Sequence, residues 1–273
     1  MSLEGKTVLL TGATDGIGLC TAKLLAGEGV RLLLHGRSSE RLQAAAQAIR
    51  PHPAETLRAD LASLAEVRDL VEGLRQRPAL DAVIHNAGVG PGPRGQSRQT
   101  SVDGHELRWA VNVLAPFAAT EWLIAAGRAP RAVVNVASVA QIVIDLEDVE
   151  LQREYDGTRA YGQSKLGLIA WTLDLAERQG GIRADALHPG SLLETKMVTE
   201  GFGYSLGRPE SGAEAIRFVL EQALDHGVSG AYFDVKAQAK AKAQAYNAKA
   251  RKALRDHNRV AVAPFARGLD IPG

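Results

Sequence analysis

Short apolar runs alternate along the chain with longer stretches in which Ala, Leu, Glu and Arg recur at helical spacing. The short runs are rich in Val, Leu and Ile, which favours strands, and each run except the last is followed by a segment of helical length. Parallel neighbours need such crossovers, so strand–helix–strand units are expected. The predicted strands are Thr7–Thr11, Arg31–His35, Glu55–Ala59, Ala82–His85, Ala132–Ala137, Arg183–Leu187 and Ala231–Asp234.

The predicted strands do not alternate between apolar and polar residues. The runs TVLLT, RLLLH and AVVNVA are almost continuously apolar, which is typical of strands covered on both faces. We therefore predict an α/β fold with a single-domain, Rossmann-type, doubly wound, seven-stranded parallel sheet and helices on both faces. No repeat or linker divides the chain, so residues 1–273 form one predicted domain, with a core at about 5–235 and a C-terminal helical extension and tail at 236–273.

Composition excludes several classes of protein. The 32 Lys and Arg residues against 31 Asp and Glu leave the chain almost neutral, which argues against non-specific nucleic-acid binding. The single cysteine, Cys20, cannot form an internal disulfide, and no paired Cys or His spacing indicates a metal site. No stretch approaches the roughly 18 to 20 apolar residues of a membrane span, and no signal peptide precedes the first strand. We expect a cytoplasmic protein without metal, membrane or nucleic-acid partners.

A glycine-rich turn, TGATDGIG, follows the first predicted strand and opens a helix near Ile17. Without Cβ atoms the backbone can turn tightly and admit a pyrophosphate to the helix N-terminus, whose free N–H groups favour an anion. A tight turn without a ligand is the alternative. The expected cofactor contacts in this turn are Gly12, Thr14, Asp15, Gly16, Ile17 and Gly18.

Six motifs follow one another in an order that resembles the short-chain dehydrogenase/reductase family over about residues 5 to 235. They are TGxxxGIG, NAG at Asn86–Gly88, Asn112 in NVLAPF, Ser138 in VNVASVA, YGQSK at Tyr161–Lys165, and HPG at His188–Gly190. The stretches TSVDGHELRWAVN and DLEDVELQREYDGTRAYGQSKL, with GAYF near the end, resemble the retinol-dehydrogenase-like branch of that family. The resemblance implies a dinucleotide-binding and catalytic domain.

Tyr161 and Lys165 stand four residues apart in a predicted helix over Ala160–Gln179, so both side chains project from one face. An adjacent ammonium and a cationic nicotinamide lower the pKa of a phenol from its ordinary value near 10, and Tyr161 is therefore the predicted proton donor or acceptor. The resemblance implies that Lys165 also binds the nicotinamide ribose. It implies that Ser138 polarises the substrate carbonyl and that Asn112 supports a water relay to Lys165. Asn112 stands in a predicted helix over Glu106–Ala126, where an asparagine is unusual in the interior. As a plain cap or turn residue, Ser138 would have no such role.

The segment HGRSSER after the second strand carries no carboxylate where an NAD enzyme usually binds the ribose hydroxyls. Arg37, with Ser38 and Arg41 as further candidates, would instead bind a 2′-phosphate, which favours NADP(H). Arg37 as an ordinary solvated loop arginine is the alternative.

Further cofactor contacts are implied by the resemblance. Asp60 and Leu61 would contact the adenine, although Asp60 could equally be a helix N-cap. Asn86 would steady the sheet or serve only as a turn amide. Thr195 would contact the nicotinamide carboxamide, although it lies six residues after Pro189, where many family members have five. The remaining contacts implied by the resemblance are Ala87, Gly88, Pro189 and Gly190.

The predicted function is an NADP(H)-dependent oxidoreductase acting on a carbonyl or secondary alcohol of a small molecule. A flap over Leu192–Arg208 with Phe202 and Tyr204, and the loop near Arg94 and Arg98, would select the substrate. A non-catalytic NADP(H)-binding regulator, or an epimerase or dehydratase on the same fold, are the alternatives. The resemblance also implies a homodimer or homotetramer, paired through the helices carrying Trp109–Ala126 and Ala160–Gln179.

Other features are interpreted as structural. The basic, Ala-rich stretch Val235–Asp256 is predicted to be a helix that packs on the domain with its lysines in solvent. Its predicted packing face is formed by Ala239, Ala243, Tyr246, Ala250 and Ala253. Packing or subunit contact is predicted for Trp109, Trp122 and Trp171, and structural roles for His35, His85 and His188.

Overall fold

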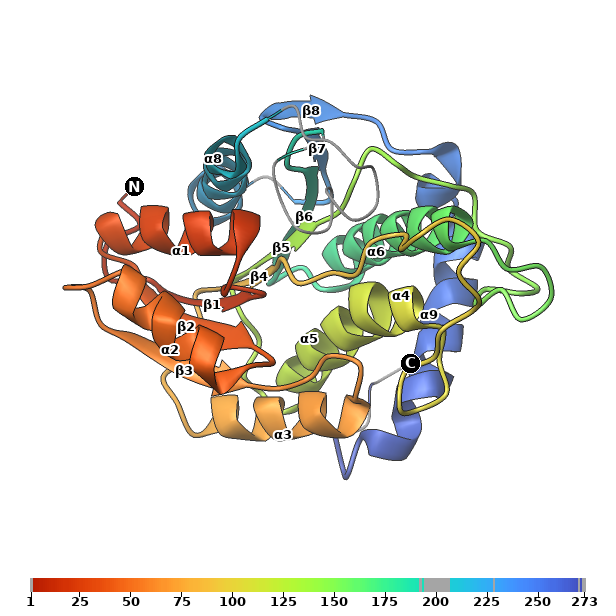
Figure 1. Ribbon diagram of the computed structural model, residues 1–273, viewed down its shortest axis with the longest axis horizontal. Helices are drawn as coiled ribbons and strands as arrows, with labels where there is room; N and C mark the ends of the chain where they lie inside the picture. Colours follow the sequence, from red (N-terminus) through yellow and green to blue (C-terminus); the bar gives the residue numbers. More distant parts are fainter. Residues whose placement is uncertain (1, 192, 194–206, 228, 270, 272–273) are drawn as a thin grey trace.

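The computed structural model describes residues 2–191, 193, 207–227, 229–269 and 271, which form a single α/β domain around one sheet (Figure 1). The sheet order is β3-β2-β1-β4-β5-β6-β7-β8. Neighbours from β1 to β7 are parallel, as predicted, and β8 adds an antiparallel eighth strand that the sequence analysis missed. The strands are β1 (Thr7–Thr11), β2 (Arg31–Gly36), β3 (Ala54–Arg58), β4 (Ala82–His85), β5 (Ala132–Val136), β6 (Arg183–His188), β7 (Tyr232–Asp234) and β8 (Ala237–Ala239).

Helices cover both faces of the sheet, so one hydrophobic core lies on each side of it. Helices α1, α2 and α8 pack on one face, and α3, α5 and α6 pack on the other (Figure 1). The bounds are α1 (Gly16–Gly27), α2 (Ser39–Ala48), α3 (Leu64–Arg75), α4 (Leu107–Trp109), α5 (Ala115–Ala125), α6 (Gly157–Arg178), α8 (Pro209–Glu221) and α9 (Ala248–Val262).

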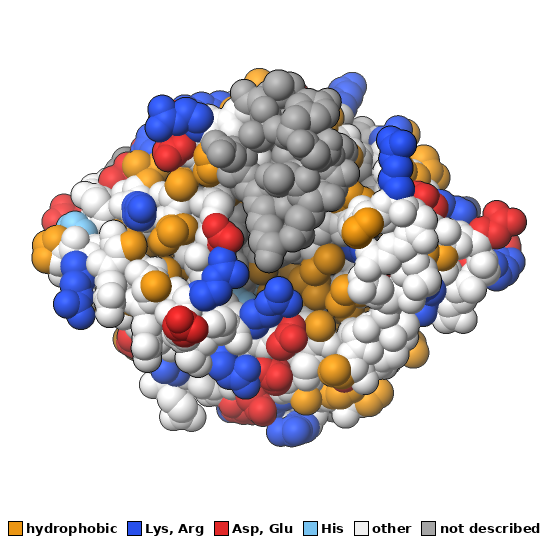
Figure 2. Space-filling model, viewed as in Figure 1, with side chains coloured by type: hydrophobic (Ala, Val, Ile, Leu, Met, Phe, Trp, Pro, Cys, Tyr) orange, Lys and Arg blue, Asp and Glu red, His pale blue; other side chains and the backbone are white. Residues whose placement is uncertain are grey.

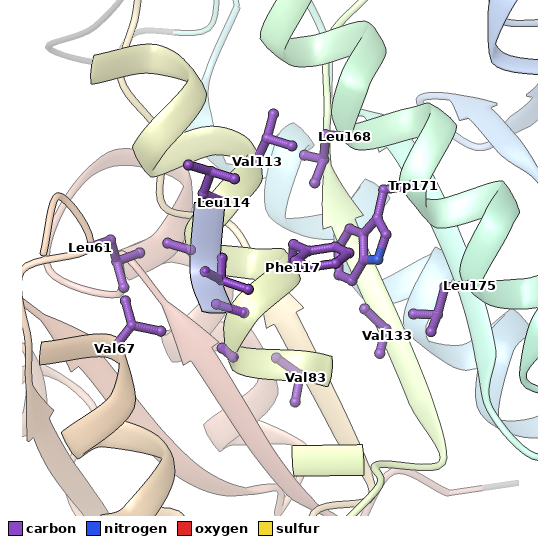
Figure 3. Close-up of a cluster of buried hydrophobic side chains, with 14 of the residues drawn as sticks. Leu61, Val67, Val83, Val113, Leu114, Phe117, Val133, Leu168, Trp171 and Leu175 are labelled. Carbon is purple, nitrogen blue, oxygen red and sulfur yellow. The ribbon is translucent and has the colours of Figure 1, made fainter. Parts of the chain in front are cut away.

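The continuous apolar runs of the strands are explained by this double burial. Along β1, Leu9 packs into the core beneath α3, α5 and α6, whereas Val8 and Leu10 pack into the core beneath α1, α2 and α8. Because side chains of a strand alternate between faces, an apolar residue is needed at every position. Figure 3 shows the first of these cores, where Phe117 and Trp171 meet over Val133.

The predicted helix over Glu106–Ala126 is interrupted. Between α4 and α5 the chain forms a π-helix, η1 (Ala110–Leu114), and Asn112 lies at its centre. Such single π turns occur often at functional sites. The polar residue that looked out of place in a helix interior therefore marks a local change in helix type.

The C-terminal segment differs from its prediction. The chain forms β8, a short 3₁₀ turn η3 (Ala243–Tyr246) and then α9, so no helix begins at Val235. The predicted packing face was right at Ala250 and at the half-buried Ala239, which packs against the core, and wrong at Ala243, Tyr246 and Ala253, which are exposed. The buried positions of α9 are Ala250, Leu254, Asn258 and Val262.

Helix α9 lies against α6 and is held there by ion pairs. Arg251 pairs with Glu177, and Arg255 pairs with Asp174. Trp109 donates from Nε1 to Asn258 Oδ1 at 3.2 Å. Basic residues of this segment thus form ion pairs within the chain, in line with a packing role.

All three tryptophans named in the sequence analysis are buried, which confirms their packing role. Because α9 covers part of α6, subunits could pair through that part of the α6 surface only if α9 moved. The oligomeric state stays a prediction. Within the described part of the chain, no helix combines the length and apolar character needed to cross a membrane.

Candidate active site

A cavity of about 1270 Å³ lies at the carboxyl ends of the parallel strands, where sheets of this type hold their ligands. Basic side chains gather near the centre of this face of the molecule, over the ends of β1 and β2 (Figure 2). The cavity brings together nearly all of the predicted site residues. Those that line it are Gly12, Thr14, Asp15, Gly16, Ile17, Gly18, Arg37, Asp60, Leu61, Asn86, Ala87, Gly88, Ser138, Tyr161, Lys165, Pro189 and Gly190.

The glycine-rich turn is packed too tightly for side chains. Gly12 has φ +66°, and a Cβ there would lie 2.8 Å from the Cα of Ala87; a Cβ on Gly18 would lie 2.0 Å from the Gly12 carbonyl oxygen. Asn86 donates from Nδ2 to the carbonyls of Thr11 and Gly12 at 3.0 and 3.1 Å. Asn86 therefore joins β4 to β1 and the turn, as the first of its two proposed roles requires.

Two arginines line the cavity at the end of β2. Arg37 follows the strand directly, and Arg41 Nη2 lies 2.6 Å from Asp15 Oδ2 in an exposed ion pair. Ser38 is the N-cap of α2 and accepts a hydrogen bond from the amide of Arg41. The ion pair neutralises part of the charge of Arg41, which leaves Arg37 as the principal cation here.

Asp60 is not a helix cap. Its Oδ1 accepts from the amide of Ala62 at 3.0 Å, and the N-cap of α3 is Ser63. The N-cap alternative for Asp60 was therefore wrong, and Asp60 and Leu61 remain together at the cavity wall.

Tyr161 and Lys165 lie one turn apart on α6, and Ser138 follows β5, so three of the four predicted catalytic side chains converge at the cavity. The Lys165 ammonium is 5.7 Å from the centre of the Tyr161 ring and donates to the Val136 carbonyl at 2.9 Å. Burial lowers the pKa of Lys165 to about 8.

Burial raises the pKa of the Tyr161 phenol, and its hydrogen bond with Ser138 acts in the opposite direction. Lys165 does not itself shift this pKa in the present arrangement of side chains, and its lowering by Lys165 together with a cationic nicotinamide stays a prediction. The phenol is instead an acid that keeps its proton at neutral pH.

Asn112 does not contact Lys165 directly. Its Oδ1 accepts from the Val89 amide at 2.8 Å, while Nδ2 donates to the Val89 carbonyl and to Ser164 Oγ at 3.0 and 2.9 Å. Asn112 thus fixes the backbone that follows β4. A role through a water relay remains a prediction.

The sequence analysis missed two residues that hold Ser138. The Ser138 carbonyl accepts hydrogen bonds from Gln141 Nε2 and from the Tyr232 hydroxyl, each at 3.2 Å. Gln141 Oε1 in turn accepts from the amide of Lys242 at 2.9 Å. The backbone at Lys242 therefore restrains the loop that carries Ser138, a contact across about a hundred residues that no local motif could reveal.

One of the two segments predicted to select the substrate lies at the cavity. The loop after β4 lines the cavity, but through Gly92, Pro93, Gln96 and Gln99, and not through Arg94 or Arg98. Arg98 donates from Nε to the Glu150 carbonyl at 3.0 Å. Thr195, Phe202 and Tyr204 lie outside the described residues.

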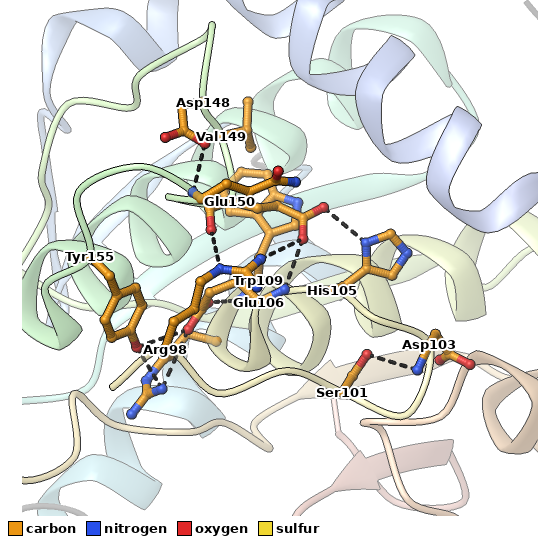
Figure 4. A network of polar contacts seen from close by, with 12 residues as sticks. Arg98, Ser101, Asp103, His105, Glu106, Trp109, Asp148, Val149, Glu150 and Tyr155 are labelled. Atoms are coloured by element: carbon orange, nitrogen blue, oxygen red, sulfur yellow. Dashed lines mark hydrogen bonds and ion pairs between the residues drawn. The ribbon is translucent and has the colours of Figure 1, made fainter. Parts of the chain in front are cut away.

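A buried polar network lies behind this loop (Figure 4). Glu150 accepts hydrogen bonds from the Glu106 amide, from His105 and from His257 on α9. Burial opposes ionisation of Glu150, but the hydrogen bonds lower its pKa to about 2. The network ties the start of α4 to the segment before α6 and to the C-terminal helix.

The three histidines near strand ends have local partners. His35 Nε2 is 3.1 Å from the Ala59 carbonyl, His85 Nε2 is 2.9 Å from Thr120 Oγ1, and His188 Nε2 is 3.0 Å from Ser191 Oγ. Burial lowers the pKa of His35 to about 4 and that of His85 to about 3. Searching the described residues finds no group of His, Cys, Asp and Glu that could hold a metal ion.

The fold and the site define the class of Rossmann-type oxidoreductases. The chain belongs to the short-chain dehydrogenase/reductase family, whose model, described as short chain dehydrogenase, matches residues 6–202. Retinol dehydrogenase 13 of Mus musculus is 34% identical over 262 residues, which span 85% of this chain and 76% of that protein. The chain thus falls in the retinol-dehydrogenase-like branch.

Two solved structures are similar throughout. A short chain dehydrogenase from Burkholderia cenocepacia in complex with NADP has a TM-score of 0.69 and 27% identity, covering 87% of this chain and 99% of its own. A 3-ketoacyl-(acyl-carrier-protein) reductase from Brucella melitensis complexed with NADH has a TM-score of 0.67 and 27% identity, covering 86% and 98%.

Proposed function

We propose that this protein is an NADP(H)-dependent oxidoreductase that interconverts a carbonyl and a secondary alcohol on a small molecule. The observation that carries the proposal is the convergence of Ser138, Tyr161 and Lys165 in the same cavity as the glycine-rich turn. A neutral phenol beside a hydroxyl and a buried ammonium can exchange a proton with an alcohol oxygen. The bound nicotinamide would supply or accept the hydride.

The residues present fit a dinucleotide. The turn around Gly12 and Gly18 has no room for side chains and opens α1, whose N-terminal amides suit a pyrophosphate. Asp60 and Leu61 would contact the adenine, and Lys165 the nicotinamide ribose. Asn86, Ala87, Gly88, Pro189 and Gly190 would complete the site, with Thr195 as a further proposed contact.

Arg37 supports NADP(H) over NAD(H). A guanidinium at the end of β2 would pair with a 2′-phosphate, and no carboxylate stands there to accept from a 2′-hydroxyl. Arg41 would add a second cation if its pair with Asp15 opened or was shared. The similar structures with NADP and with NADH are compatible with either cofactor, so the preference rests on Arg37.

In the proposed reduction, Tyr161 gives its proton to the substrate oxygen and Ser138 orients that oxygen by a hydrogen bond. Lys165 then stabilises the phenolate, for which its ammonium must leave the Val136 carbonyl or share it. Asn112 positions the backbone at Val89 beside this centre. A homo-oligomer, a cytoplasmic location and the assignment of residues 1–273 to one functional unit stay part of the proposal.

The test is a titration of the purified protein with NADPH and with NADH, followed by thermal shift, together with a carbonyl screen. The expected result is tighter binding of NADPH, with the preference reduced or reversed in Arg37→Asp. Tyr161→Phe should bind NADPH as the wild type does and lose turnover by about a thousandfold or more. Binding without turnover would favour a regulator, and substrate conversion without net NADPH consumption would favour an epimerase or dehydratase.

A further inference from the structure

Arg108 is a buried cation at the cavity wall that the proposed mechanism does not use. Its side chain is 2% exposed. Nε donates to the Gly90 carbonyl at 3.1 Å, Nη2 to the Pro91 carbonyl at 3.0 Å, and Nη1 to the Tyr155 hydroxyl at 2.8 Å. Burying a guanidinium is costly unless its donors are satisfied, so this arrangement points to a specific role.

Arg108 and Asn112 act on consecutive residues of the chain. They stand four apart on the α4–η1 segment, where Asn112 binds both backbone groups of Val89 and Arg108 binds the next two carbonyls. Together they fix the chain as it leaves the cofactor-side segment Asn86–Gly88. The loop that begins at Gly90 is therefore anchored at its first two residues.

The same loop also lies against the helix that carries Tyr161. A Cβ on Gly157, the first residue of α6, would lie 2.4 Å from the Pro91 carbonyl oxygen. Pro91 is thus held between Arg108 and the start of α6. Beyond it, Gly92, Pro93, Gln96 and Gln99 face the cavity, so their positions depend on this anchor.

The fork shape of the guanidinium matters for this contact. Two nitrogens of one planar group donate to two successive carbonyls, a geometry that a single ammonium cannot reproduce. Charge balance is partial, because Glu106 Oε1 is 3.4 Å from Nη1 and accepts also from the Tyr155 hydroxyl at 3.2 Å. Burial raises the pKa of Glu106, and the Arg108 charge opposes this rise.

We propose that Arg108 is a positioning residue that determines substrate selectivity, by holding the loop over residues 90–99 as a fixed wall of the substrate cavity. The inference rests on the proposed function. Carbonyl compounds large enough to touch that wall should depend on Arg108, whereas small ones that contact only the catalytic centre should not. Asn112 holds Val89, next to the proposed cofactor contacts, and Arg108 holds Gly90 and Pro91, next to the proposed substrate wall.

The test compares Arg108→Met with the matched control Arg153→Met, which removes an arginine that is 64% exposed and close in sequence to Tyr155. The probes are the three-ring dicarbonyl 9,10-phenanthrenequinone and the small dicarbonyl 2,3-butanedione, each with NADPH. We expect kcat/KM for the quinone to fall about tenfold or more, mainly through KM, and kcat/KM for the butanedione to change less than about threefold. Equal losses for both probes, or equal effects of the two variants, would overturn the inference.

Hydrogen exchange separates this inference from the proposed function. In Arg108→Met, amides of residues 90–99 should exchange about tenfold faster while those of 5–18 keep the wild-type rate. Unchanged exchange at 90–99 refutes the inference even if the enzyme is active, and absence of carbonyl reduction by the wild type refutes the proposed function alone. If Arg108→Met does not fold, Arg108→Lys replaces it, because lysine keeps the charge without the forked guanidinium. A lysine variant with wild-type selectivity and wild-type exchange would contradict the inference that donation to two carbonyls holds the loop.

Discussion

The Lys165 ammonium donates a 2.9 Å hydrogen bond to the carbonyl of Val136, two residues before Ser138. This contact joins the helix that carries Tyr161 to the strand that leads to the serine. Because Lys165 is buried and its pKa is lowered to about 8, its charge changes within an accessible pH range. The charge state of this one group should therefore be visible in the kinetics.

The first prediction concerns pH. On the proposed mechanism, protonated Lys165 is the active form, so kcat/KM for carbonyl reduction should fall above about pH 8, since this parameter reports groups of the free enzyme. Arginine stays charged, so Lys165→Arg should retain reduced activity and shift that alkaline limb upward by about one unit or more. Lys165→Met should lose activity at every pH. An unmoved limb in Lys165→Arg would assign it to another group.

The second prediction concerns the support of Ser138. Gln141→Ala removes both the donor to the Ser138 carbonyl and the acceptor of the Lys242 amide, so the serine should shift and kcat should fall about tenfold or more. Gln141→Glu keeps the acceptor and loses the donor, and it should be impaired as well. NADPH binding should stay within about twofold in both. The exposed Gln152→Ala is the control, and an equal effect there would contradict the prediction.

The third prediction concerns stability and pH. Asp185 on β6 accepts from the Ala231 amide, and burial raises its pKa to about 6 from 3.8. The folded state therefore keeps a proton that the unfolded chain releases, so this group's contribution is lost as pH rises from about 4 to 6. Asp185→Asn should be more stable than wild type near pH 7, by on the order of 2 kcal/mol, and the gain should shrink near pH 4.

Urea unfolding at the two pH values measures this difference directly. Asp69→Asn, which changes a carboxylate with 68% exposure, is the control and should give no pH-dependent gain. A gain of equal size at both pH values would show that the charge of Asp185 is not responsible.

The fourth prediction concerns the C-terminal helix. Leu254 is buried in the hydrophobic core where α9 packs against α6, and Leu254→Ala should lower the free energy of unfolding by about 2 to 4 kcal/mol. Ala253→Ser alters the exposed neighbour and should change it by less than about 0.5 kcal/mol. Equal effects would mean that α9 packs on the face predicted from the sequence and not on the one described.

Most of the fold could be predicted from local patterns in the sequence, and the errors of that prediction have a physical cause. The bounds of β1 and β4 agree with prediction because each is a short apolar run bounded by turns. At the C-terminal end, composition favoured a helix from Val235, but Val235 adopts φ +57° and turns the chain back so that β8 pairs with β7. A positive φ at a β-branched residue is a tertiary effect that propensity does not predict.

The residues of the candidate site likewise fall into those that the sequence predicted and those that it missed. Tyr161, Lys165 and the glycines were found because their chemistry depends on spacings of a few residues. Arg108, Gln141 and Tyr232 were missed because each has a partner that is distant in the chain: Tyr155 for Arg108, Lys242 for Gln141 and Ser138, 94 residues away, for Tyr232. The pairing of Arg41 with Asp15 was missed for the same reason.

The π-helix at Ala110–Leu114 has a consequence for insertions and deletions. An α-helix turns about 100° per residue, so a segment with one extra residue per turn rotates everything after it relative to an unbroken helix. Arg108 and Trp109 lie before this step, and the buried face of α5 with Phe117 and Trp122 lies after it. Deleting a single residue here would force one of the two sets out of the core, whereas many side-chain replacements would not. In this stretch the fold therefore depends on the number of residues as well as on the buried side chains themselves.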